Sequence, residues 1–142
     1  MCILVGSLIG IYGIAFGMFP LNKIAIKGYD AVAYYKDGKA VKGNDSYKHR
    51  WHDMIWYFST QENRDLFASR PEKYAPQFDG YCAWAMTEAR KAETDPEVWK
   101  IVGGKLYLNC SRSAYEKWSR DIRGNIKKAD KNWSEISGEK SR

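Results

Sequence analysis

Stretches in which apolar and polar residues alternate with a period of two predict β-strands in the middle of the chain. In the clearest of them, Tyr47, His49 and Trp51 share one face, while Lys48 and Arg50 lie on the other. Apolar runs bounded by turn residues predict further strands at 31–35, 40–42 and 55–59, and a hairpin over 101–108. We therefore expect short antiparallel strands joined by tight turns.

Helical spacing of apolar residues dominates the rest of the chain. Ser59 and Glu62 have the spacing of a capping box and predict a helix that ends before Pro71. Ser111 is the expected cap of a later helix, which Gly124 would end. Further helical stretches are expected at 71–74, from 95 onward, and at 126–136. No internal repeat is apparent, and strands followed by helices indicate an α+β domain, a small antiparallel sheet with packed helices.

An uncharged apolar segment precedes this domain. Residues 2–19 predict an N-terminal hydrophobic helix, which is either a signal peptide or a membrane anchor. Ala15 and Gly17 are small residues in the spacing of a signal-peptide cleavage site. We divide the chain into that segment (1–19), a single domain (20–136) and a polar tail (137–142), and expect an exported protein, periplasmic or membrane-tethered.

The net charge of +6 makes the chain mildly basic. Such a surface can meet nucleic acid or an anionic membrane. However, no nucleic-acid-binding motif is present, and the basic residues are interspersed with acidic ones, so an ordinary solvated surface is favoured and no nucleic-acid partner is expected. The expected contacts are the membrane, through residues 2–19 if they are not cleaved, and an unidentified protein or small ligand.

Motifs of the common catalytic classes are absent from the sequence. It contains no H-E-x-x-H, G-x-S-x-G, P-loop or G-x-G-x-x-G pattern, and no carboxylate lies in an apolar run that would raise its pKa. Hydrolase and transferase activities are therefore disfavoured, and no catalytic residue is assigned.

Cys82 is the residue with the most chemical potential, because it lies in the apolar, aromatic stretch 78–86. It can act as a small core hydrophobe, pair with Cys110 in a disulfide, or bind a metal or react as a thiol. His49 is either a core histidine with a hydrogen-bond partner or a ligand beside Cys82, since imidazole and thiolate suit copper or zinc. The candidate metal site is thus Cys82, His49 and Cys110.

Several short blocks together resemble one known family. They are Gly28-Tyr29-Asp30, Tyr57-Phe58, Phe67, residues 71–76, Gly80-Tyr81-Cys82-Ala83, residues 104–109, Trp118, Ala129-Asp130 and Trp133. From about residue 26 to residue 133 the chain resembles the exported YHS domain-containing proteins. The resemblance implies a small α+β domain, and the short YHS domain of copper-transporting ATPases implies metal binding through cysteines.

The chain departs from that metal-binding form. The resemblance places the family's cysteines at Ala33, Ser59 and Asn63, and none of these side chains can supply the thiolate that a soft copper site needs. The leading hypothesis is a non-enzymatic exported binding domain that can hold a soft metal. The alternatives are a cofactor-free, membrane-tethered structural or protein-interaction module and, third, a thiol-dependent enzyme that uses Cys82 and His49.

Overall fold

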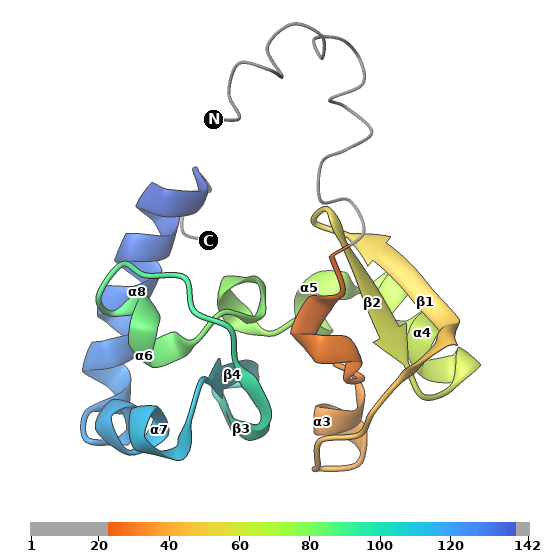
Figure 1. Ribbon diagram of the computed structural model, residues 1–142, viewed down its shortest axis with the longest axis horizontal. Helices are drawn as coiled ribbons and strands as arrows, with labels where there is room; N and C mark the ends of the chain where they lie inside the picture. Colours follow the sequence, from red (N-terminus) through yellow and green to blue (C-terminus); the bar gives the residue numbers. More distant parts are fainter. Residues whose placement is uncertain (1–22, 139–142) are drawn as a thin grey trace, which may run out of the picture.

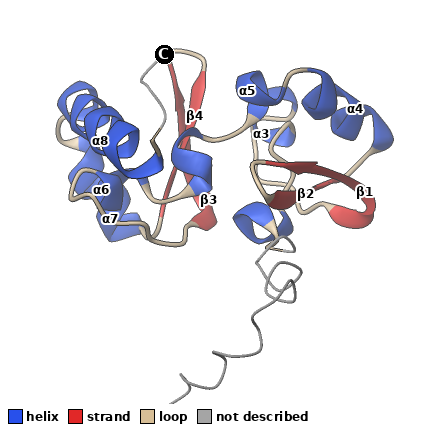
Figure 2. Ribbon diagram, turned by 90° about the horizontal axis from the view of Figure 1, so that it is seen from above, coloured by secondary structure: helices blue, strands red, loops and turns tan. Residues whose placement is uncertain are grey.

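The chain folds into two similar units that lie side by side (Figure 1). A computed structural model describes residues 23–138. The fold is α+β, as predicted, but it contains two small antiparallel sheets rather than one (Figure 2). The predicted N-terminal hydrophobic helix, its cleavage site and most of the polar tail lie outside the described residues. Within them, no helix has the length and apolar character needed to cross a bilayer.

Both units contain the same elements in the same order. The first unit comprises η1 (Ala25–Gly28), α3 (Ala33–Lys36), β1 (Asn44–Trp51), β2 (Met54–Phe58), α4 (Gln61–Ser69) and α5 (Pro71–Tyr74). The second comprises η2 (Gln77–Gly80), α6 (Ala83–Met86), β3 (Asp95–Val102), β4 (Lys105–Asn109), α7 (Arg112–Ser119) and α8 (Ile122–Ser137).

The two units are an internal repeat, which the sequence analysis missed. Every residue pair of the β1–β2 hairpin recurs in β3–β4 after a shift of 51 positions, including the irregularity between Asn44 and Lys48, which returns between Asp95 and Trp99. A shift of 52 positions relates the segments that precede the hairpins. The amide of Asp30 donates to the carbonyl of Val41 at 2.8 Å, and the amide of Cys82, 52 positions later, donates at 2.9 Å to the carbonyl of Ala92, which is 51 positions after Val41.

Three local predictions of secondary structure differ from the structure. The predicted strand 31–35 contains helix α3, because the Asp30 carboxylate accepts the free amides at the start of that helix. Residues 40–42 contribute only a single bridge, from Lys42 to Tyr29. The stretch from Asp95 is strand β3 rather than a helix, because it pairs with β4. Tertiary pairing overrides the local helix-start signal there.

Two predicted helix boundaries also differ from the observed ones. Thr60, not Ser59, caps α4, because the Ser59 hydroxyl donates to Asp30 instead. Gly124 does not end a helix but lies in the first turn of α8, where its amide donates to the capping carboxylate of Asp121. Ser111 caps α7 as predicted.

Strand β4 joins the two cores, because its side chains alternate between them. Leu106 and Leu108 pack into the core of the first unit, whereas Tyr107 packs into the core of the second. In the first unit the equivalent outward positions on β2 are Ile55 and Tyr57, and both remain half-buried. The second hairpin is therefore apolar on both faces because it is internal to the array.

Helix α8 covers the end of the second unit. It packs along α6, with Ala129 buried and Trp133 against Phe78. The side-chain amide of Asn132 donates to the carbonyls of Met86 and Thr87, at 2.8 and 3.2 Å, and so satisfies the end of α6. In the first unit the equivalent helix α3 is covered by the β3–β4 hairpin of the second unit, since Tyr34 of α3 packs against Trp99 of β3. Helix α8 thus acts as the terminal cap of a two-unit array.

The carboxylate of Asp30 holds the first unit together from a fully buried position. One oxygen accepts from the amides of Val32 and Ala33 at the start of α3. The other accepts from the amide and hydroxyl of Ser59 and from the Asn63 side-chain amide, at 2.7 to 2.8 Å. A single side chain therefore connects α3, the end of β2 and the first turn of α4.

We predict that Asp30→Ala lowers the free energy of unfolding by about 3–5 kcal/mol, because it leaves several buried donors without an acceptor. Urea denaturation followed by tryptophan fluorescence measures this change. Asp37→Ala, at an exposed position seven residues along, is the control and should change stability by less than about 0.5 kcal/mol. Equal effects of the two substitutions would contradict the role given to Asp30.

Candidate thiol site

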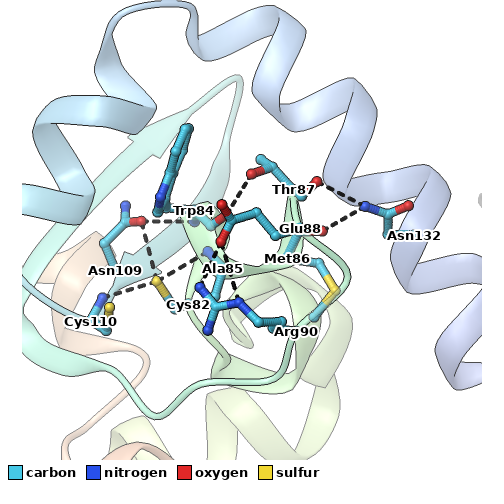
Figure 3. A network of polar contacts seen from close by, with 10 residues as sticks. All are labelled: Cys82, Trp84, Ala85, Met86, Thr87, Glu88, Arg90, Asn109, Cys110 and Asn132. Carbon is cyan, nitrogen blue, oxygen red and sulfur yellow. Dashed lines mark hydrogen bonds and ion pairs between the residues drawn. The ribbon is translucent and has the colours of Figure 1, made fainter.

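Cys82 occupies in the second unit the position that Asp30 occupies in the first. It precedes α6, is fully buried, and its sulfur accepts from the amide of Ala85 at 3.5 Å. The sulfur also accepts from the amide of Cys110 at 3.1 Å, just as Asp30 accepts from the amide of Ser59. Figure 3 shows these contacts converging on the sulfur. Cys82 therefore connects the start of α6 to the end of β4.

Asn109 supplies the acceptor that a thiol lacks. A carboxylate has two acceptor oxygens, whereas a cysteine offers one sulfur. The Asn109 side-chain oxygen accepts from the amide of Trp84 at 2.9 Å and lies 3.6 Å from the Cys82 sulfur, which donates to it (Figure 3). In the first unit the equivalent of Asn109 is Phe58, and Asp30 itself accepts the equivalent amide, that of Val32. Cysteine and asparagine together thus replace one aspartate.

The two cysteines of the site differ in exposure. Both are free thiols, with Cys82 buried and Cys110 exposed. Burial raises the pKa of the Cys82 thiol, and proximity to Cys110 raises it further, although the amides of Ala85 and Cys110 act in the opposite direction. The site therefore contains one solvent-accessible thiol, that of Cys110, and one buried thiol with a raised pKa, that of Cys82.

His49 does not join the two thiols. It lies on β1 in the first unit, and its ring packs edge-on against Phe67 with the centroids 6.1 Å apart. Burial and the nearby Arg64 lower the pKa of His49. Of the three predicted metal ligands, the structure brings together only Cys82 and Cys110. Nowhere in residues 23–138 do three side chains of His, Cys, Asp or Glu converge as a metal site would require.

A third position completes the site in the first unit but not in the second. The Asn63 side chain reaches Asp30 at 2.8 Å from the first turn of α4. Its equivalent on α7 is Ala114, which is buried and packs with Cys82. The positions 82, 110 and 114 thus repeat the cluster 30, 59 and 63 with two thiols and a methyl group.

Neither Asn109 nor the Asp30 cluster was singled out from the sequence. One sequence feature could have revealed the repeat and the equivalence of Asp30 and Cys82. The tetrapeptides Gly28-Tyr29-Asp30-Ala31 and Gly80-Tyr81-Cys82-Ala83 differ only at that position. Comparison with protein-family models, with curated proteins and with solved structures finds no match to this chain.

We predict that Cys110 reacts with iodoacetamide at least about tenfold faster than Cys82 in the folded protein, because only Cys110 reaches solvent. Peptide mapping by mass spectrometry at short labelling times distinguishes the two sites. Both should react at similar rates in urea, and comparable rates in the folded protein would show that Cys82 is accessible.

We also predict that Cys82 contributes to a loss of stability at alkaline pH. Its pKa in the folded protein is raised above the ordinary value of 9.0, so the stabilisation by the neutral thiol is complete below pH 9.0 and is lost as the pH rises through the folded-state pKa. Cys82→Ser should therefore reduce the decline in urea-unfolding free energy above that pH. The half-buried Tyr35 and the buried Tyr107, whose pKa values burial raises to about 12, will also contribute to the decline, so part of it remains in the variant. An unchanged slope in the variant would contradict the assignment.

Proposed function

We propose that the chain is an exported, non-enzymatic YHS-type binding module that holds a soft monovalent metal, Cu(I), between Cys82 and Cys110. The observation that carries the proposal is the 3.1 Å contact between the Cys82 sulfur and the backbone amide of Cys110, whose own thiol is exposed. Two thiols at neighbouring positions offer the ligands that Cu(I) prefers.

The donor set favours copper over zinc. Structural zinc is bound by four ligands, which Cys82 and Cys110 alone do not supply. The amides of Ala85 and Cys110 already donate to the Cys82 sulfur, and such bonds stabilise the thiolate that forms when the metal replaces the proton. Cys110 provides the route for the metal, since Cys82 is closed to solvent.

The second unit also fits the metal-binding form of the family better than the first unit does, because it has a cysteine at an equivalent position. The resemblance assigns one family cysteine to Ser59, which is a serine here, and the 51-residue shift takes Ser59 to Cys110. The second unit thus has a thiol at the position where the first unit has a serine.

A thiol-dependent enzyme is a weaker reading of the same residues. A nucleophilic cysteine needs a lowered pKa and a neighbouring base. Burial raises the pKa of Cys82 instead, and His49 lies in the other unit, so it cannot act as the base for this thiol.

We predict that Cys82→Ser and Cys110→Ser each weaken Cu(I) binding by at least about tenfold, because each removes one of two ligands. Anaerobic competition against a chromophoric Cu(I) chelator measures the affinity, and thermal unfolding checks that each variant still folds. Ser59→Ala, the equivalent position in the first unit, is the matched control and should leave the affinity unchanged.

A gain-of-ligand variant sharpens the test. Ala114 packs with Cys82 and is equivalent to Asn63, so Ala114→Cys should place a third thiol at the site and tighten Cu(I) binding. If wild type and both serine variants bind Cu(I) equally, the metal proposal fails, and the cofactor-free interaction module takes its place.

A further inference from the structure

The helix pair α7 and α8 carries an excess of basic residues. Between Arg112 and Lys131, which covers α7 and most of α8, seven residues are Lys or Arg and three are Asp or Glu. This segment therefore carries a net charge of +4, two thirds of the +6 of the whole chain. The equivalent segment of the first unit, residues 61–80, has three basic and four acidic residues. The excess of basic residues on this helix pair therefore has no counterpart on the equivalent helices of the first unit.

These cations are not used within the fold. Arg120, Arg123, Lys127, Lys128 and Lys131 are all exposed. Among residues 23–138 the ion pairs involve other side chains, and none of these five takes part in one. A cation paired with a neighbouring carboxylate would contribute little to attracting a partner, whereas these five add their charges to one field.

Helix α8 arranges three of the five in a row. Arg123, Lys127 and Lys131 are four residues apart in succession, which places them on one stripe at intervals of about 6 Å along the helix. Next to this stripe, Val102, Ile122 and Ile126 line an apolar groove of about 340 Å³ whose fourth lining residue is Arg123. The surface therefore combines a line of positive charge with half-buried aliphatic side chains.

We propose that this surface of α7 and α8 binds the anionic surface of a phospholipid membrane. A lipid surface complements a row of unpaired cations whatever their exact spacing, because its charges are mobile and numerous. The groove has only three aliphatic side chains, too few for the roughly 1,000 Å² of buried surface that a stable protein interface typically requires. Those side chains can contact the interfacial region once the charges have brought the helix to the membrane. This inference is independent of the metal proposal, since no residue of the thiol site contributes to it.

The test uses the full chain and vesicles of two compositions, equimolar phosphatidylglycerol and phosphatidylcholine, and phosphatidylcholine alone. The variant Arg123→Gln/Lys127→Gln/Lys131→Gln removes the stripe. The control Lys27→Gln/Lys39→Gln/Lys42→Gln removes the same charge from exposed lysines of the first unit. The apolar residues 2–19 are identical in both proteins, so any contribution from them cancels in the comparison.

We expect the stripe variant to bind the anionic vesicles on the order of 100-fold more weakly than wild type, because each cation near the surface contributes about fivefold. The control variant should lose less than about tenfold, since its charges do not face the membrane. Binding of wild type should also fall when the salt is raised from about 0.1 M to 1 M. Flotation of the vesicles measures all three.

Three results would overturn the proposal. Equal losses in the two variants would show that only net charge matters. Equal binding of wild type to both vesicle types would show that lipid charge plays no part. Binding of wild type to poly-L-glutamate, without binding to anionic vesicles, would assign the surface to an acidic protein segment instead.

Discussion

A buried acceptor at the start of a short helix is the interaction on which each unit of this protein depends. The backbone amides at the start of the helix and at the end of the following hairpin have no backbone acceptor, and a buried amide without a hydrogen-bond partner is costly. The Asp30 carboxylate solves the problem with two oxygens that receive five hydrogen bonds. In the second unit one sulfur and the Asn109 amide oxygen do the same work. The geometry of the repeat is conserved between the units, although the chemistry of the acceptor is not.

The sequence was informative where structure depends on local signals. The strand containing His49 and the cap at Ser111 follow from alternation and side-chain chemistry within a few residues. The same reasoning failed at α3 and at Asp95, because their conformations are decided by Asp30 and by pairing with β4, which are tertiary contacts. The repeat was missed because the equivalent residues differ in kind, with Asp30 matching Cys82 and Phe58 matching Asn109.

The thiol site was predictable only in part, for the same physical reason. Cys82 and Cys110 could be predicted as a pair, since Cys82 lies in an apolar, aromatic stretch and Cys110 follows the predicted hairpin. His49 was also nominated, because its position on the apolar face of a strand is all that the sequence reveals. Whether a face points toward the first or the second unit depends on how the two hairpins are packed, and no local pattern encodes that packing. The role of Asn109 could not be predicted, because it depends on a tertiary hydrogen bond from the amide of Trp84, which is equivalent to the amide of Val32 that Asp30 accepts in the first unit.

Differences between the units follow from their places in the array. The outer face of β2 carries Ile55 and Tyr57, whereas the matching face of β4 carries Leu106 and Leu108, because β4 is covered by the first unit and β2 is not. Helix α5 is short because the second unit follows it, whereas α8 is long because it must cover α6 alone. A helix that covers a core with one face leaves its other face free of structural demands. That freedom allows the exposed face of α8 to carry Arg123, Lys127 and Lys131. In the second unit a sulfur and an asparagine satisfy these amides, so the sulfur that the proposed Cu(I) site needs also has a structural role.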